Sequence, residues 1–469
     1  MQVYNTLTKQ KEEFTPLHIG KVGMYVCGPT VYDYIHIGNI RAYVFADTLR
    51  RTLEDIGYEM RLIKNITDVG HLTADDIAQG DSGEDKVAKK AEKEHKTPEE
   101  IARFYEEYAL TTEKAMNIEP AHYFPRATAH IKQMIVLIED LIKKGHAYEK
   151  NGNVFLDVTT FPDYGKLSGN TLANLQVGAR LEEHPDKKNP WDFALWLKAP
   201  IGHLMHWPSP WSEGYPGWHI ECSAMSMEYL GDTLDIHTGG EDNIFPHHEA
   251  EIVQSEGVTG KPFVRYWLHT RHMLVDGTKM SKSKGNFYVL EDLIERGYTP
   301  MDFRLLLISA HYRSQMNFTW ESLEQAKKNK ESLFGIVERL ADLSIRENSD
   351  GFDGAEFFAS FRGAMQDDLN TPLALSSALE LTKKINTTLD QNEKVNKASL
   401  EKVFEKIFFL FGLTKEAVVI PKEVDDLAAA RVAARIAKDF TLSDHLRDEI
   451  LALGYKVEDV ADGYRVKKA

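Results

Sequence analysis

Cysteine is the scarcest residue of this 469-residue chain, with only Cys27 and Cys222 present. Two thiols so far apart, in a chain whose first residues (MQVYNTLTKQKEEF) form no apolar signal core, exclude a small secreted domain held by disulfides. Long apolar runs are also missing, and the longest fall well short of a membrane span. We therefore expect a cytoplasmic protein outside the membrane, whose thiols bind a metal or react.

Positive charge is also scarce: the chain has 56 lysines and arginines but 72 aspartates and glutamates, which gives a net charge of −16. This balance excludes a uniformly cationic nucleic-acid binder, although a nucleic acid can still bind a local basic surface. The remaining composition, 42% hydrophobic and 27% charged, is typical of globular proteins. The length suggests roughly three domains, and the chain has no internal repeat.

A strand, a turn, a helix and a second strand follow one another near the start. Lys21–Cys27 (KVGMYVC) alternates as a half-buried strand does, and apolar residues recur at helical spacing from Ile37 until Gly57. Met60–Ile66 (MRLIKNI) is predicted to be the next strand. This βαβ unit indicates an α/β protein with a Rossmann-like, doubly wound parallel sheet. No G-x-G-x-x-G turn follows the first strand, which disfavours a nucleotide-dependent oxidoreductase.

The rest of the chain is predicted from its composition and from the positions of turn-forming residues. We expect a solvated, charge-dense loop at 81–100 leading into an exposed helix, then an insertion at 116–214 and a strand at 233–237. Helices should follow Met301, with a polar linker at 349–355. After Pro421 we expect helices at 425–438 and 443–453 and short strands at 455–457 and 464–466.

The second cysteine lies close to a pair of histidines and a glutamate. Cys222 belongs to PGWHIECSAM, and the segment DIHTGGEDNIFPHHEAEI follows it. His247 and Glu251 are four residues apart and would share one face of a helix, whereas His248 is three residues from Glu251 and is an equal rival by geometry. Together with Cys27, these side chains could hold a tetrahedral zinc ion. Each residue alone is more often a buried side chain than a ligand.

A second group of residues points to a nucleotide. His36-Ile37-Gly38-Asn39 falls at the predicted strand-to-helix turn, where backbone N–H groups should be exposed to a phosphate. Gly38 has no side chain, so a flat base could pack there. Downstream, Asp276–Asn286 (DGTKMSKSKGN) interleaves three lysines with serines between two glycines. Such a loop could bring lysines to phosphates that gain charge during a reaction, although most lysine clusters are only solvated.

Taken together, these motifs resemble the class I aminoacyl-tRNA synthetases, whose signatures are a His-Ile-Gly-His turn and a Lys-Met-Ser-Lys-Ser loop. KMSKS stands intact at 279–283, and the first signature ends in Asn39, which can donate a hydrogen bond but cannot become cationic. Within the class, CGPTVYDYIHIGN, GWHIECSAM, HTGGEDNIFPHHEAE and KMSKSKGN resemble the cysteinyl-tRNA synthetase family. DDLNTPLAL (367–375) is similar to its helical bundle, and AARIAKDFTLSDHLRDEI to its anticodon module. TDVGHL (67–72) and Tyr464 depart from the family's pattern.

The resemblance implies a role for each matching residue. The zinc ligands would be Cys27, Cys222, His247 and Glu251, which favours His247 over His248. The ATP-phosphate group would include His36 and Asn39, with Gly38 beside the base, and the loop would contribute Lys279 and Lys282. Gly239, Gly240 and Asp242 are candidates for the ribose side of ATP, although a tight turn explains them equally well. Trp218 matches the amino-acid pocket.

The implied reaction consumes MgATP and L-cysteine to form cysteinyl-adenylate, and then transfers the cysteinyl group to the terminal adenosine of cysteine tRNA. One zinc ion per chain would explain the choice of substrate. A plain pocket separates closely similar side chains by only about 10–200-fold, whereas zinc strongly prefers a thiolate to a hydroxyl. We expect a monomer that needs no editing domain.

The same resemblance divides the chain. The expected parts are the first half of the catalytic domain at 1–115, a connective insertion at 116–214, the second half at 215–260, the KMSKS-bearing stem-contact region at 261–310, a helical bundle at 311–415 and an anticodon-binding module at 416–469. Two alternatives remain: a cysteine:amino-sugar ligase of the mycothiol type, which needs no anticodon module, and a catalytically silent tRNA-binding paralogue.

Overall fold

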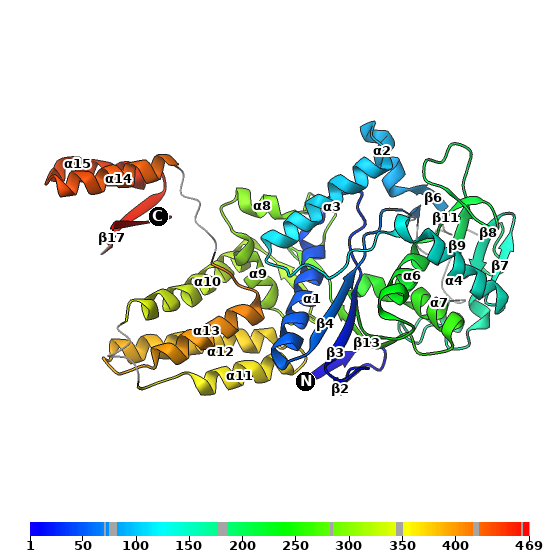
Figure 1. The fold of residues 1–469 in the computed structure, drawn as a ribbon, viewed down its shortest axis with the longest axis horizontal. Coiled ribbons are helices and arrows are strands. Elements are labelled where there is room, and N and C mark those ends of the chain that lie inside the picture. Colours follow the sequence, from blue (N-terminus) through cyan, green and yellow to red (C-terminus); the bar gives the residue numbers. More distant parts are fainter. Residues whose placement is uncertain are drawn as a thin grey trace. The chain divides into compact units, whose positions relative to one another are not determined.

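The structure is a computed structural model in which the chain forms two compact units, Met1–Leu413 and Thr414–Ala469 (Figure 1). It describes residues 1–69, 72–74, 82–175, 185–281, 285–343, 350–415, 422–460 and 463–468, without the side chains of 72–74, 82–84, 175, 458–460, 463, 465, 467 and 468.

A parallel four-stranded sheet lies at the centre of the first unit, in the order β13-β12-β3-β4. Its strands are β3 (Lys21–Val26), β4 (Glu59–Lys64), β12 (Leu234–Gly240) and β13 (Val264–Thr270). Helix α1 (Ile37–Ile56) connects β3 to β4 and ends at Gly57, whose φ of 110° suits glycine. The predicted βαβ unit is therefore confirmed.

Helices cover both sides of this sheet, as expected for a doubly wound fold. Figure 1 shows α1 on one side of β3 and β4, and α6 (Trp218–Leu230) and α7 (Glu249–Thr259) on the other. Between β4 and the insertion, the hairpin β5 (Leu72–Ala74) and β6 (Ser82–Asp85) leads into α2 (Lys86–Glu94) and α3 (Pro98–Ala115). The charge-dense segment predicted as a loop thus holds a hairpin strand and a helix, because Val87 and Ala91 give α2 a buried face.

The insertion forms its own antiparallel sheet, ordered β10-β11-β9-β8-β7. Its elements are η2 (Ala127–His130), α4 (Ile131–Lys143), β7 (Ala147–Lys150), β8 (Asn153–Leu156), η3 (Val158–Thr160), α5 (Leu172–Leu175), β9 (Phe193–Lys198), β10 (Trp207–Pro208) and β11 (Glu213–Pro216). Two further short elements, η4 (Glu241–Asn243) and η5 (Ile244–His248), come between β12 and α7.

Two regions remain in the first unit. An N-terminal hairpin, absent from the sequence prediction, pairs β1 (Gln2–Asn5) with β2 (Gln10–Glu13). The chain after β13 continues through β14 (Met273–Val275), β15 (Thr278–Lys279), α8 (Leu290–Glu295), α9 (Pro300–Ile308), β16 (Met316–Phe318), α10 (Trp320–Ala341), α11 (Ala355–Gln366), α12 (Thr371–Asp390) and α13 (Lys397–Phe411). It is helical after Met301 as predicted, except that β16 adds a strand beside β14.

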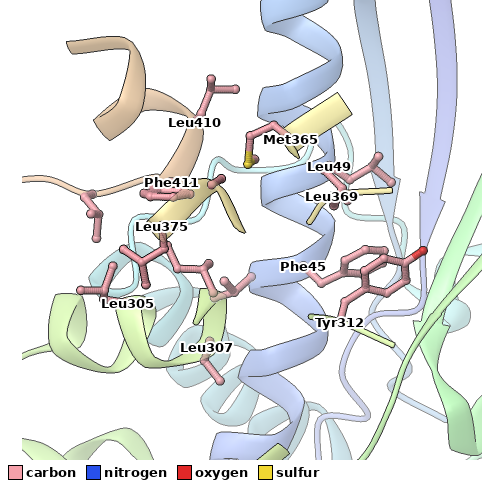
Figure 2. Packing of buried hydrophobic residues seen from close by; sticks show 14 of the residues in the cluster. Phe45, Leu49, Leu305, Leu307, Tyr312, Met365, Leu369, Leu375, Leu410 and Phe411 are labelled. Atoms are coloured by element: carbon pink, nitrogen blue, oxygen red, sulfur yellow. The ribbon is translucent and has the colours of Figure 1, made fainter. Parts of the chain in front are cut away.

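Helix α1 shares one hydrophobic core with the helices after residue 300. Figure 2 shows Phe45 and Leu49 of α1 among side chains from α9, α11, α12 and α13. The ring of Phe45 stacks on Tyr312 with centroids 4.3 Å apart. Helix α1, which begins at the predicted nucleotide turn, is thus held in place by packing against the helical bundle.

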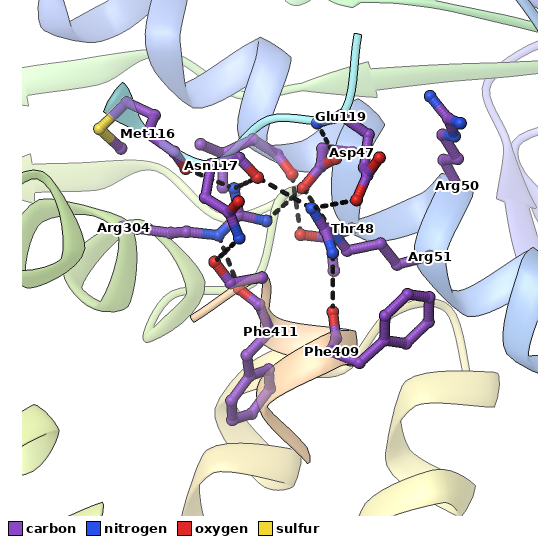
Figure 3. A network of polar contacts seen from close by, with 12 residues as sticks. Asp47, Thr48, Arg50, Arg51, Met116, Asn117, Glu119, Arg304, Phe409 and Phe411 are labelled. Carbon is purple, nitrogen blue, oxygen red and sulfur yellow. Dashed lines mark hydrogen bonds and ion pairs between the residues drawn. The ribbon is translucent and has the colours of Figure 1, made fainter. Parts of the chain in front are cut away.

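Buried charges reinforce this joint (Figure 3). Arg304 of α9 is fully buried, forms an ion pair with Asp47 of α1, and donates hydrogen bonds to the carbonyls of Phe411 at 2.6 Å and Met116 at 2.8 Å. Arg51 donates to Asp47 Oδ2 at 2.8 Å. Removing one member of such a network would leave an uncompensated buried charge, at a cost of about 3–5 kcal/mol.

The second unit contains α14 (Lys422–Ile436), α15 (Phe440–Ala452) and the antiparallel hairpin β17 (Tyr455–Val460) and β18 (Gly463–Lys468). Its small core includes Val424, Ala428, Ile450 and Val466. Two helices followed by two short strands are what the sequence predicts. Among the described residues, no helix of either unit is long and apolar enough to cross a membrane.

Candidate active site and metal centre

A cavity of about 470 Å³ lies where β3 and β12 end, which is the edge at which parallel α/β sheets bind ligands. Most of the predicted site residues line it: Cys27, His36, Gly38, Asn39, Trp218, Cys222, Gly239, Gly240, Asp242, His247 and Lys279. Glu251 is fully buried and does not line the cavity. Lys282 lies outside the described residues.

The four predicted metal ligands come together from separate parts of the chain. Cys27 directly follows β3, Cys222 is on α6, His247 belongs to η5, and Glu251 lies in the first turn of α7. One ligand atom of each lies within 4.8 Å of every other. Cys222, His247 and Glu251 are buried. Two sulfurs, an imidazole and a carboxylate at this separation are a donor set that fits zinc.

The predicted helix that joins His247 to Glu251 is divided between two elements. His247 lies in η5, which the extended backbone of Phe245 interrupts (φ −142°, ψ 132°), and α7 begins at Glu249. His247 nevertheless faces Glu251, with 3.1 Å between its Nε2 and Oε1 of the carboxylate. Oε1 is buried and accepts no hydrogen bond of suitable geometry, which leaves it available to an ion.

Burial and mutual charge set the protonation of these ligands. The hydrogen bond with Cys27, burial and nearby negative charge raise the pKa of the Cys222 thiol well above its usual value. Burial alone would lower the pKa of His247, but Cys222 and Glu251 raise it to about 10. Burial opposes ionisation of Glu251, yet His237 and His247 lower its pKa to about 2. A cation that binds these four side chains would therefore have to displace protons from them.

Further histidines hold the ligands in place. His237 Nε2 lies 3.0 Å from Glu251 Oε2, and His219 Nδ1 lies 3.0 Å from His247 Nδ1. Burial and the neighbouring His247 lower the pKa of His219 well below its usual value, so His219 can accept a hydrogen bond from His247. Partners of this kind orient metal-ligating side chains in proteins.

His248, the rival ligand, has a different environment. Its Nε2 lies 3.2 Å from Cys27 Sγ, and its Nδ1 lies 2.8 Å from His269 Nε2. Ligand atoms of Cys27, His237, His248 and Glu251 also lie within 4.8 Å of one another and form a second group. Sequence reasoning missed His219, His237 and His269, although the density of histidines between 219 and 269 was a usable signal.

The predicted nucleotide turn differs from expectation in its backbone. His36 caps α1, and its Nδ1 accepts hydrogen bonds from the N–H groups of Gly38 at 3.0 Å and Asn39 at 3.3 Å. The N–H of Ile37 donates to the carbonyl of Tyr288. The backbone donors expected to face a phosphate are therefore occupied within the protein. Asn39 Oδ1 accepts from the His36 N–H at 3.0 Å, which leaves its amide NH₂ as a side-chain donor.

The two signature segments touch each other. A Cβ on Gly38 would lie 2.6 Å from Cε of Met280 and 2.9 Å from the His36 ring, so glycine gives the methionine side chain room to approach this closely. The rings of His36 and Phe287 meet edge to face with centroids 5.1 Å apart. The apolar methionine of the lysine loop is therefore the residue that packs against the nucleotide turn.

Arg41, one turn into α1, ties the same segments together. Its guanidinium donates to the carbonyls of Arg271 at 2.7 Å and His272 at 3.0 Å, and to those of residues 311, 312 and 314 at 3.2, 3.5 and 2.7 Å. These carbonyls precede β14 and β16, the strands that pair beside β15. Arg41 thus anchors the small sheet whose β15 ends at Lys279.

The side chain of Asn286 forms hydrogen bonds with the described residues at both ends of the lysine loop. Asn286 accepts a hydrogen bond from the N–H of Ser281 at 2.9 Å and donates to Thr278 Oγ1 at 3.0 Å. Lys279, at the end of β15, is exposed and lines the cavity.

The three ribose candidates have different environments. A Cβ on Gly239 would lie 2.7 Å from the His248 ring, which is a structural reason for glycine there, whereas the nearest atom to a Cβ on Gly240 is 3.6 Å away. Asp242 lies at the cavity, 2.9 Å from His272 Nε2. His272 was not predicted from the sequence.

Trp218 forms part of the cavity wall beside the metal ligands. Its indole stacks on His247 with centroids 4.2 Å apart and 22° between the planes. Trp218 is the first residue of α6, four residues before Cys222. One helix therefore supplies both a metal ligand and an aromatic wall.

The chain is similar to known proteins along almost its whole length. Residues 13–328 match the family model for the class I tRNA synthetase (C) catalytic domain, and residues 360–415 match the DALR domain. A cysteine–tRNA ligase of Chlorobaculum tepidum is 42% identical over 99% of this chain and 98% of its own. One of Caldicellulosiruptor saccharolyticus is 44% identical over all of both chains. Among solved structures, methionyl-tRNA synthetase of Mycobacterium tuberculosis with methionyl-adenylate has a TM-score of 0.60 at 13% identity, covering 84% of this chain and 89% of its own.

Proposed function

This chain belongs to the cysteine–tRNA ligase family of class I aminoacyl-tRNA synthetases. From that membership we propose which residues of the cavity bind cysteine and which bind ATP. The enzyme joins cysteine to tRNA at the expense of ATP. The observation that carries this conclusion is identity of 42–44% to cysteine–tRNA ligases over essentially the complete chain.

Two steps make up the proposed reaction. The carboxylate of cysteine attacks the α-phosphorus of MgATP, which releases pyrophosphate and leaves cysteinyl-adenylate. A ribose hydroxyl of the terminal adenosine of the tRNA then attacks the activated carbonyl, loses its proton and displaces AMP. Positioning of the reactants supplies much of the rate in such reactions.

The thiol of the substrate is recognised at the metal centre. Cys27, Cys222, His247 and Glu251 would hold one zinc ion, and their donor chemistry and close approach support this assignment. When bound there, zinc supplies a preference for the thiolate of cysteine over the hydroxyl of serine. His219 and His237 would keep the His247 ring and the Glu251 carboxylate in position, and Trp218 would limit the room for a larger side chain.

The ATP would lie on the opposite side of the cavity. His36 and the Asn39 amide would contact phosphate oxygens through their side chains, because the backbone donors of the turn are occupied. Gly38 would lie beside the base. Lys279 and Lys282 would neutralise charge that develops on the leaving pyrophosphate. Asp242 would accept hydrogen bonds from the ribose, with Gly239 and Gly240 allowing its approach.

The finer partner and location assignments remain predictions. We propose cysteine tRNA as the acceptor, a monomeric state, and a cytoplasmic location. We also keep the division of the first unit at residues 115, 214, 260 and 310 and the assignment of 416–469 to the anticodon as proposals. The amino-sugar ligase has no specific support, since the matched cysteine–tRNA ligases extend over the complete chain.

The first experiment is cysteine-dependent exchange of pyrophosphate into ATP, followed by charging with cysteine tRNA and an amino sugar as competing acceptors. We expect exchange and charging of the tRNA alone. Exchange with transfer only to the sugar would replace the proposal by the amino-sugar ligase. Binding of tRNA without any exchange would indicate the silent paralogue.

A further inference from the structure

Two exposed aromatic rings, those of Tyr34 and Phe104, lie at the cavity and just outside it. Tyr32 and Tyr34 line the cavity, and the side chain of Tyr34 remains 42% exposed. The ring of Tyr34 meets that of Phe104 of α3 at 6.3 Å and that of Tyr105 at 5.2 Å, both edge to face. Phe104 is 47% exposed. A continuous aromatic surface therefore leads from the cavity wall to the outside of α3.

Lysines lie over aromatic rings of this region. Lys96 lies 5.5 Å from the ring centroid of the exposed Phe104, whereas Lys86 and Lys90 lie 5.8 and 5.3 Å from the centroids of the partly buried Tyr32 and the buried Tyr105. Helix α2 carries four lysines and two glutamates in a chain whose net charge is −16. Glu94 pairs with Lys90 at 3.3 Å and with Lys96 at 3.0 Å, which reduces the local positive charge without reversing it.

The proposed reaction brings the 3′ end of the tRNA to the cavity, next to this surface. The terminal adenosine of the tRNA has to reach cysteinyl-adenylate in the cavity, and a cavity of about 470 Å³ that already holds the adenylate leaves no room for further nucleotides. The unpaired nucleotides before the terminal adenosine must therefore lie just outside. Exposed aromatic rings with neighbouring lysines suit them, because unpaired bases stack on rings and phosphates pair with lysines.

We propose that the surface formed by Tyr34, Phe104, Lys86, Lys90 and Lys96, here called the entry surface, binds the unpaired 3′ end of the tRNA. A base stacks on the exposed rings, and the phosphates on either side lie near the lysines. This inference rests on the tRNA-charging function and assigns that function a contact on α2 and α3, outside the residues that bind ATP and cysteine.

The first test combines a protein change with a tRNA change. Phe104→Ala should raise the KM for cysteine tRNA about tenfold, since one base stacked on an aromatic ring contributes roughly 1–3 kcal/mol. A tRNA with an abasic nucleotide before its terminal adenosine should show a similar rise with the unchanged enzyme. Both changes together should raise the KM no further than either alone, because they remove the same interaction.

Tyr123→Ala is the matched control. Tyr123 is 49% exposed and lies 5.6 Å from the Arg61 guanidinium, but it does not line the cavity. Its replacement should leave the KM for tRNA unchanged. An unchanged KM in Phe104→Ala, or a product of the two separate effects of about 100-fold, would overturn the stacking interaction. Pyrophosphate exchange, which needs no tRNA, separates this outcome from failure of the proposed activation step.

The lysines are tested through salt. The double variant Lys86→Gln, Lys96→Gln should reduce the slope of log KM for tRNA against log salt by about 1.4, because each phosphate of a single strand that a lysine neutralises adds about 0.7 to the slope. An unchanged slope would remove the lysines from the entry surface.

Discussion

The two sides of the cavity are built in different ways. The metal side is enclosed: Cys222, His247 and Glu251 are buried, and a further histidine contacts each of His247 and Glu251. The ATP side joins segments more than 200 residues apart, through Met280 against Gly38 and through Arg41, and its Lys279 is exposed. From this comparison we infer that the proposed selection of the thiol would use a preformed site, whereas the proposed activation would depend on the alignment of two segments.

The largest effect should follow from breaking the metal side. Cys222→Ser should lose bound zinc and lower cysteine affinity by more than about 100-fold, because loss of an outer partner alone costs 10–100-fold. Metal analysis and exchange kinetics at varied cysteine would measure both. Ser226→Ala, a buried change on the same helix, is the control. Full zinc occupancy in Cys222→Ser would remove that residue from the site.

The second-largest effect should be the change of zinc affinity with pH. At pH 7 the four ligand side chains hold protons on Cys27 and Cys222, whose thiol pKa values are both raised, and on His247, whose pKa is about 10, while Glu251 with a pKa of about 2 is already ionised. Zinc must displace at least two protons. Its affinity should therefore rise at least about 100-fold per pH unit between pH 6 and 8.

Calorimetry in buffers of different ionisation enthalpy would count these protons. Two or more released per zinc is the expected result, and His247→Gln should release fewer. An affinity independent of pH would mean that the ligands are already deprotonated in the metal-free protein, contrary to the electrostatics of the buried group.

A smaller and separate effect should follow on the ATP side. Arg41→Lys keeps the charge but cannot reach all five carbonyls, so the sheet that carries Lys279 should lose its alignment with the nucleotide turn. We expect the kcat of exchange to fall about tenfold, corresponding to the loss of about 1.4 kcal/mol, with zinc content and cysteine KM unchanged.

Arg50→Lys is the matched change on the same helix, because Arg50 bonds only Glu54 and the carbonyl of Pro120 among the described residues. It should keep normal exchange. A fall in zinc content in Arg41→Lys would show that the two sides are not independent, and an unchanged kcat would show that Arg41 has no positioning role.

The sequence predicts the parts of this molecule that depend on local pattern. The alternation of Val22, Met24 and Val26 indicated β3, and helical spacing indicated α1. The four-residue separation of His247 and Glu251 predicted that these side chains lie together, and they do so from η5 and the first turn of α7. These features depend on neighbours in the chain.

Other features depend on partners far away in the sequence. The five carbonyls bound by Arg41 belong to residues 271–314, so no local pattern reveals them. The occupied N–H groups of Gly38 and Asn39 result from the orientation of the His36 ring, which sequence spacing does not determine. The contact between Tyr34 and Phe104 likewise requires the packing of α3 against the segment after β3.

The central claim is that the metal side selects cysteine while the other side binds ATP. The direct measurement is the affinity of the zinc-depleted enzyme for cysteine and, separately, for ATP, by calorimetry before and after zinc is restored. The account predicts that depletion abolishes cysteine binding, leaves ATP binding within about twofold, and that added zinc restores cysteine binding. Retention of full cysteine affinity without zinc would contradict it.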